Sequence, residues 1–231
     1  MSMNTYLFAG ASSKIALETA RLLKEQGHKV IGISTKSENT VYDSFYKVEK
    51  YDFASFPSIV EVIDGLVYFP GTINLKPFNR LSQNDFINDY QINSLGAVAF
   101  VQAYLNNLKQ STQASIVFIS TVAVATGMAY HSSVSMAKGA IEGLTKALAA
   151  EFAPAIRVNC IAPSLADTPL AEKFINTPEK LEASQKRNPL RRVGSATDIA
   201  SAIDFLLGSK ATWITGQIIA VDGGMNNLKL L

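Results

Sequence analysis

The chain has 231 residues, of which 48% are hydrophobic and 17% charged, and its formal net charge is +2 at pH 7. This length favours one domain with a sizeable core over two, so we expect a single domain over residues 1–231. The sequence contains no clustered run of Lys or Arg, which excludes the usual electrostatic signature of nucleic-acid binding and of binding to an anionic membrane surface. Small molecules and further copies of the chain are the expected partners.

The cysteine content and the N-terminal residues bear on the cellular compartment of the protein. Cys160 is the only cysteine, so there is no disulfide framework and a reducing environment is favoured. The first residues lack the basic start and apolar stretch of a signal peptide, and no apolar run approaches the length of a membrane span. These features predict a cytoplasmic protein that does not enter the membrane.

The first 33 residues predict a strand, a glycine-bearing turn, a helix and a second strand. An apolar run at residues 6–9 stops at Gly10, helical periodicity follows, and residues 28–33 predict a second, buried strand. Such a unit holds a dinucleotide pyrophosphate at the helix N-terminus. The candidate phosphate contacts are the residues of the turn and of the first helical turn: Gly10, Ser12, Ser13, Lys14 and Ile15.

Lys14 has two interpretations, because its ammonium could reach a phosphate or its Cβ could crowd the turn if the position requires a positive φ. At the end of the second strand, an NAD-binding protein usually places an acid against the ribose hydroxyls. This chain has Thr35 and Lys36 there instead. A hydroxyl and an ammonium suit a 2′-phosphate, so we predict NADP(H) over NAD(H), the alternative being that Lys36 is only a solvated loop residue.

The next segments are short. Residues 46–51 alternate between apolar and polar and predict a third strand, which delivers Asp52 and Phe53. Residues 53–64 leave room for a crossover helix of one or two turns with Pro57 near its start. A fourth apolar run at residues 65–69 then ends at Pro70 and Gly71.

Three later stretches carry a resemblance to a known family. The first is IVFIST at residues 116–121 followed by YHSSVSMAKGAIEGLTK at 130–146, the second is RVNCIAPS at 157–164, and the third is TGQIIAVDGG at 215–224. In this order they resemble the short-chain dehydrogenase/reductase family, and the similarity extends over nearly the whole chain. The resemblance implies an α/β fold in one domain, a doubly wound, Rossmann-like seven-stranded parallel sheet with helices on both faces.

The resemblance also implies roles for individual residues. Lys138 would bind the nicotinamide ribose, the Thr121 hydroxyl would hydrogen-bond the substrate carbonyl, and Asn93 would kink its helix so that its backbone carbonyl holds a water against Lys138. The cofactor would contact further residues at the ends of other strands: Asp52, Phe53, Pro70, Gly71, Pro163 and Thr168. Residues 171–184 would form a mobile lid over the substrate.

One position departs from the family at the centre of its chemistry. The family carries a Tyr four residues before the Lys, and its hydroxyl gives a proton to the carbonyl oxygen while hydride arrives from the nicotinamide. This chain has Val134 at that position, and valine cannot donate a proton. The turn after the fourth strand departs as well, since Tyr68 and Phe69 replace two Asn residues of the family.

Three interpretations of Val134 remain open. In the first, another group donates the proton; His131 lies seven residues before Lys138, two helical turns, and therefore on the same face. The alternative for His131 is a helix cap or a position at the mouth of the pocket. In the second interpretation the protein binds NADP(H) as a catalytically impaired sensor or scaffold, and in the third only a stable fold remains.

Together these features predict an NADP(H)-dependent oxidoreductase of the short-chain dehydrogenase/reductase type that acts on a carbonyl or enoyl small molecule with a non-standard proton donor. The long helices expected at residues 85–108 and 132–153 carry small apolar residues. The family packs these helices across a two-fold axis, so we expect a homodimer or homotetramer.

Overall fold

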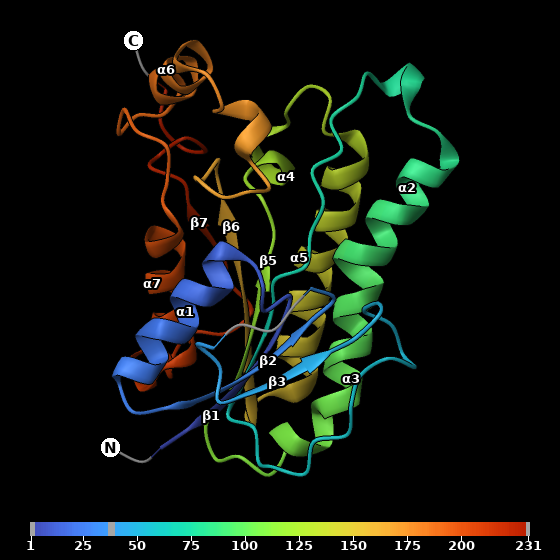
Figure 1. Cartoon of the computed structure of the whole chain (residues 1–231), viewed down its shortest axis with the longest axis vertical. Coiled ribbons are helices and arrows are strands. Elements are labelled where there is room, and N and C mark those ends of the chain that lie inside the picture. The colour runs from blue at the N-terminus through green and yellow to red at the C-terminus, as the bar shows by residue number, and fades with distance from the viewer. Residues whose placement is uncertain (1–2, 37–39, 230–231) are drawn as a thin grey trace.

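The computed structural model describes residues 3–36 and 40–229, so the first two and last two residues of the domain expected over 1–231 lie outside the described chain. One sheet runs through the centre of the molecule, and helices cover both of its faces (Figure 1). This is the α/β architecture that the sequence predicts.

The seven strands form one parallel sheet in the order β3-β2-β1-β4-β5-β6-β7, which confirms the predicted doubly wound sheet. The order reverses between β1 and β4, and open α/β sheets bind ligands at such a reversal. The strands are β1 (Thr5–Ala9), β2 (Lys29–Ser34), β3 (Ser44–Lys47), β4 (Gly65–Tyr68), β5 (Ala114–Ile119), β6 (Ile156–Pro163) and β7 (Ile218–Val221).

The helices form two layers. On one face lie α1 (Lys14–Glu25) and α7 (Ala196–Leu207), and on the other lie α2 (Gln83–Tyr90), the π-helical turn η2 (Gln91–Leu95), α3 (Gly96–Leu108) and α5 (Ser132–Phe152) (Figure 1). The shorter helices are η1 (Phe78–Arg80), α4 (Ala123–Thr126), η3 (Glu172–Phe174), α6 (Pro178–Arg187) and η4 (Ser209–Ala211). No helix within the described ranges is both long enough and apolar enough to cross a bilayer.

Apolar side chains on both faces of the strands hold the layers together. Leu7 lies in the cluster beneath α3 and α5, and its neighbour Phe8 lies in the cluster beneath α1 and α7. Successive strand residues point to opposite faces, so a strand covered on both faces needs a continuous apolar run. The run at residues 6–9 therefore predicted a buried strand correctly.

Two expectations between β2 and β4 are wrong. The third strand is Ser44–Lys47 rather than residues 46–51, because β2 ends at Ser34, which pairs with Lys47 and leaves the later residues without a partner strand. The short crossover helix is also absent: residues 48–64 contain no helix in the described chain. Phe56 covers this part of the core instead, with its ring 5.3 Å from that of Phe100.

Candidate active site

The predicted site residues lie where the carboxyl ends of the parallel strands meet. Gly10 follows β1, Gly71 lies just beyond β4, Thr121 follows β5, and Pro163 ends β6. All strands run in the same direction, so these residues share one edge of the sheet on either side of the β1/β4 reversal. The fold thus gathers segments that are up to 153 positions apart in the chain, as the ion pair between Lys14 and Asp167 shows.

The glycine turn is tightly packed. Gly10 has φ +73°, and a Cβ at this residue would lie 2.8 Å from Cδ of Pro70. Only glycine meets both conditions without strain. Ser13 then caps α1, because its side chain accepts a hydrogen bond from the amide of Ala16. The first amides of a helix have no partner inside it, so those of Lys14 and Ile15 remain available to an anion.

Lys14 is the first residue of α1 and does not occupy a position with positive φ. Its Cβ therefore does not strain the turn, and the second of its two interpretations is wrong. Its Nζ lies 3.0 Å from Oδ2 of Asp167, in the loop that follows β6. Both side chains are about half exposed or more, so the pair contributes little to stability and is free to exchange partners.

The end of β2 presents hydroxyls and a cation. Ser34 is buried and donates from Oγ to Oγ of Ser12 at 2.9 Å, and the amide of Lys36 donates to the same Ser34 Oγ. Thr35 and Lys36 are exposed. This edge of the predicted adenosine site carries no acidic side chain among the described residues 34–36.

Asp52 and Phe53 lie in the turn after β3. Hydrogen bonds from Lys50 and Ser55 lower the pKa of Asp52 to about 2, so its carboxylate is ionised and already engaged in shaping the turn. Phe53 is 60% exposed, which leaves its ring accessible to a flat ligand. The cofactor contacts predicted for both residues remain predictions.

Lys138 is the most unusual charged residue of the site. It is only 6% exposed, and its Nζ donates to the backbone oxygen of Ile119 at 2.8 Å. Burial lowers the pKa of Lys138 to about 8, an effect that nearby Cys160 on β6 opposes. Burying an ammonium in such surroundings costs free energy. Groups with a pKa shifted in this way cluster at functional sites.

Asn93 faces Lys138 across Gly71. Asn93 lies in the π-helical turn η2 and is fully buried. A Cβ on Gly71 would lie 3.2 Å from Asn93 Oδ1 and 3.3 Å from Lys138 Nζ. The three residues therefore meet at one point, and a side chain at Gly71 would crowd both Asn93 and Lys138.

The loss of two Asn residues after β4 is compensated in part. Tyr68 donates from its hydroxyl to the backbone oxygen of Ile92 at 2.7 Å, which ties the end of β4 to η2. Burial holds the pKa of Tyr68 well above its usual value, so it serves as a neutral hydrogen-bond donor. This strand end therefore has polar support from the Tyr68 hydroxyl.

The predicted substrate side contains Thr121, His131 and Val134. Thr121 Oγ1 accepts a hydrogen bond from the amide of Ala123, which leaves its own proton free for a ligand. His131 is the N-cap residue of α5, and its Nδ1 lies 2.7 Å from the oxygen of Ala129. A carbonyl oxygen only accepts, so Nδ1 carries a proton and Nε2 is left for other partners. Val134 is buried, one helical turn before Lys138.

The predicted lid lies over this side of the sheet. The backbone oxygen of Pro163 accepts from Val122, and Thr168 accepts from Ala171 at the start of the lid. Further along, Lys173 in η3 donates to the oxygen of Ile73 at 3.2 Å. The lid therefore rests on the loop after β4, the same loop that contains Gly71.

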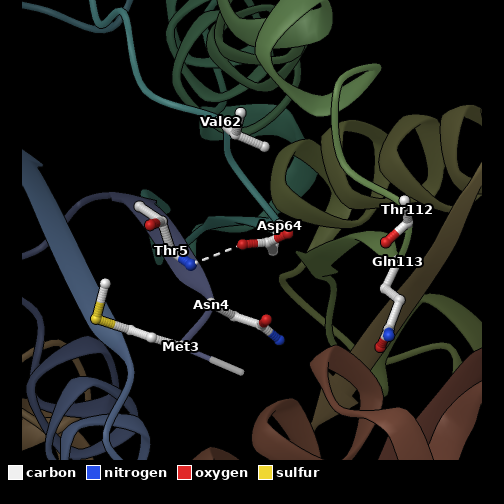
Figure 2. A pocket seen from close by; sticks show the side chains of 7 residues that line it. All are labelled: Met3, Asn4, Thr5, Val62, Asp64, Thr112 and Gln113. Carbon is white, nitrogen blue, oxygen red and sulfur yellow. Dashed lines mark hydrogen bonds between the residues drawn. The ribbon is translucent and has the colours of Figure 1, made fainter. Parts of the chain in front are cut away.

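A pocket lies at the opposite edge of the sheet, where β1 and β4 begin. Figure 2 shows the side chains that line it, among them Thr5 at the start of β1 and Asp64 just before β4. Its volume is about 330 Å³. The carboxylate of Asp64 accepts from the amide of Thr5 at 2.8 Å and from the hydroxyl of Ser111 at 2.6 Å. Asp64 thus joins three segments of the fold, which is a structural role.

Two residues of the site were missed by sequence reasoning. Thr72 and Asp89 hydrogen-bond each other and surround Asn93. Thr72 follows directly after Gly71, and Asp89 lies four residues before Asn93 on the same helical stretch, so an acid at this spacing from the helical Asn was the available signal.

Comparisons with known proteins agree with this geometry. A family model described as enoyl-(acyl carrier protein) reductase matches residues 52–226. A tropinone reductase homolog of Arabidopsis thaliana is 37% identical over 69% of this chain, and the match spans only 52% of that relative, about half its length. The 3-oxoacyl-[acyl-carrier-protein] reductase FabG of Thermotoga maritima is 30% identical, over 95% of this chain and 96% of its own.

A solved structure shows the same fold. The short chain dehydrogenase family protein of Francisella tularensis subsp. tularensis has a TM-score of 0.90 and 26% identity, with 98% of this chain and 100% of that chain covered. The family match, the full-length relative and the seven-stranded sheet with Lys138 at its carboxyl edge lead to one conclusion. The chain belongs to the short-chain dehydrogenase/reductase family of oxidoreductases.

Proposed function

We propose that the chain is an NADP(H)-dependent reductase of a carbonyl or enoyl small molecule in which a group other than a tyrosine at position 134 donates the proton. The observation that carries this proposal is the buried ammonium of Lys138, which meets Asn93 and Gly71 at the carboxyl edge of the sheet. A buried cation without a carboxylate partner destabilises the fold. Its presence therefore favours a role in binding a ligand. The relative FabG, a 3-oxoacyl reductase by name, supports a carbonyl substrate.

The site fits a dinucleotide. The Gly10 turn admits close approach of a phosphate, and the first amides of α1 would hold it together with Lys14. Lys138 would hold the ribose beside the nicotinamide, and Thr35 with Lys36 would take a 2′-phosphate. When bound, NADPH supplies the hydride; NAD(H) is the less favoured cofactor because no acid follows β2 at residues 34–36.

His131 is the proposed proton donor. The hydrogen bond from Nδ1 to Ala129 orients the ring and leaves Nε2 as the atom that can exchange a proton with a substrate. Thr121 would hold the substrate oxygen with its free hydroxyl proton. Both residues are half-buried.

Substitution of His131 tests this assignment. In a screen of 3-oxoacyl and enoyl thioesters that follows NADPH oxidation, we expect His131→Ala to lower turnover by about 10²-fold while NADPH affinity stays within about twofold, because general acid catalysis contributes 10²–10⁴-fold. His28→Ala, at the far end of β2, is the matched control and should retain turnover. Full turnover of His131→Ala on a true substrate would exclude His131 as the donor.

A second candidate function rests on Val134. A chain that binds NADP(H) but has lost the usual proton donor would serve as a sensor or scaffold with impaired catalysis. Tight NADPH binding without turnover on any carbonyl or enoyl compound would favour this alternative.

Assembly and location are further parts of the proposal. Helices α2 and α5 expose apolar side chains, among them Ile87 and Met136, each 51% exposed. A Cβ on Gly143 of α5 would meet no atom within 4 Å, so a second helix could approach closely there. A homodimer or homotetramer through residues 85–108 and 132–153 would cover this face, and the single buried Cys160 suits a cytoplasmic location.

A further inference from the structure

A buried carboxylate beside the site has no role in the reaction described so far. Asp89 of α2 is 3% exposed, and its Oδ1 accepts a hydrogen bond from the hydroxyl of Thr72 at 2.6 Å. Its Oδ2 is buried and has no hydrogen-bond partner within the described ranges. Leaving a buried carboxylate oxygen unpaired costs stability, so Asp89 is not explained as a stabilising residue.

The hydrogen bonds around Asp89 determine which group donates and which accepts in each pair. A carboxylate only accepts, so Thr72 must give its single hydroxyl proton to Asp89. The Thr72 oxygen is then left as an acceptor, and it receives the Nδ2 amide of Asn93 at 2.7 Å. Asn93 Nδ2 gives its second proton to the backbone oxygen of Asp89 at 2.8 Å.

This chain of bonds determines which way the amide of Asn93 points. With Nδ2 held by Thr72 and Asp89, Oδ1 accepts from the amide of Thr72 at 3.3 Å and faces Gly71 and Lys138. Without the carboxylate, the Thr72 hydroxyl would be free to donate to Asn93, and the amide could then turn its NH₂ group toward the ammonium of Lys138. Such a turn would place the NH₂ group of Asn93 against the ammonium of Lys138, and two donors cannot hydrogen-bond each other.

We propose that Asp89, acting through Thr72, is a positioning residue that keeps the side-chain oxygen of Asn93 facing Lys138 and so prepares Lys138 for the cofactor ribose. The inference rests on the proposed cofactor role of Lys138. It also accounts for the unpaired Oδ2. The role of Asp89 is to accept the Thr72 hydroxyl proton through Oδ1, and this role does not require a partner for Oδ2.

Variants separate this role from a structural one. We expect Asp89→Leu and Thr72→Val each to weaken NADPH binding about tenfold, equivalent to ~1.4 kcal/mol, while Thr72→Ser, which keeps the hydroxyl, stays within about twofold of the native chain. The double variant should be no weaker than either single one, because both changes break the same chain of bonds. Asp89→Leu should leave the urea midpoint unchanged or raised, since it removes a buried unpaired oxygen.

Controls keep the outcomes distinct. Thr145→Val changes a buried threonine of α5 whose hydroxyl donates to the backbone oxygen of Ile141, and it should not alter NADPH affinity. In the cofactor-free protein, the side-chain amide protons of Asn93 should exchange slowly in the native chain and in Thr72→Ser, and faster in Thr72→Val. If Asp89→Leu fails to fold, the NADPH affinities and amide exchange of Thr72→Val and Thr72→Ser still test the inference.

Native affinity in both Asp89→Leu and Thr72→Val, with unchanged amide exchange, would overturn the inference. Failure of the native chain to bind NADPH would instead contradict the proposed function, and the amide-exchange measurement would still test the orientation of Asn93 by itself.

Discussion

Replacing Lys138 with Met is expected to stabilise the folded protein at pH 7 by about 2–3 kcal/mol and to abolish NADPH binding. Burial lowers the pKa of Lys138 from 10.5 to about 8, and each pKa unit corresponds to about 1.4 kcal/mol of penalty on the charged form. Loss of the hydrogen bond to Ile119 offsets part of the gain, by about 1 kcal/mol. Urea unfolding and NADPH fluorescence measure the two effects.

The pH dependence of this difference has a defined sign. Below pH 8 both the folded and the unfolded native chain carry the ammonium, so the advantage of the variant is constant. Between pH 8 and 10.5 the folded chain releases the proton while the unfolded chain keeps it, so the stability of the native chain rises relative to the variant. The advantage of Lys138→Met should therefore fade across that range.

Lys146→Met is the matched control, because Lys146 is exposed on the same helix. It should change stability by less than about 0.5 kcal/mol and leave NADPH binding intact. A Lys138→Met protein that is less stable than the native chain at pH 7, or that binds NADPH normally, would contradict the account of Lys138 as a ligand-binding cation held at a cost.

Replacing Val134 with Tyr in the His131→Ala variant, which lacks the proposed proton donor, is expected to raise NADPH-dependent reduction of a 3-oxoacyl thioester by about 10²-fold or more. The new hydroxyl would lie one helical turn before Lys138 on the same face of α5, and Thr121 has a free hydroxyl proton for the same carbonyl. Positioned general acids contribute 10²–10⁴-fold. The measurement is the initial rate of NADPH oxidation at saturating cofactor.

Val134→Phe separates the hydroxyl from its bulk, because it adds the ring without a proton donor. We expect no gain from Val134→Phe. A folded Val134→Tyr protein that binds NADPH and gains nothing would mean that Thr121 and Lys138 do not present a carbonyl correctly, which would favour the sensor or scaffold role.

The parts of the fold that follow from continuous apolar runs were predictable. The run before Gly10 is short, apolar throughout and stopped by a glycine, which favours a strand covered on both faces. Strands that run parallel bring their carboxyl ends together. The approximate location of Gly10, Gly71 and Thr121 followed from that rule.

Contacts that depend on side-chain direction were not predictable. The hydrogen bond between Thr72 and Asp89 depends on how η2 turns Asn93 toward the loop after β4. The ion pair of Lys14 with Asp167 joins loops from strands that are not neighbours in the sheet. The missing crossover helix between β3 and β4 was not predictable either, because Phe56 fills from an irregular segment the space that a helix would cover.

A titration of the purified native chain with NADPH and with NADH tests the central claim most directly, that the carboxyl edge around Gly10, Lys36 and Lys138 binds NADP(H). Nicotinamide fluorescence should show micromolar affinity for NADPH and affinity for NADH that is weaker by about tenfold or more, or ~1.4 kcal/mol. A preference for NADH would contradict the role of Thr35 and Lys36. Absence of binding for both at millimolar concentration would contradict the reductase function itself.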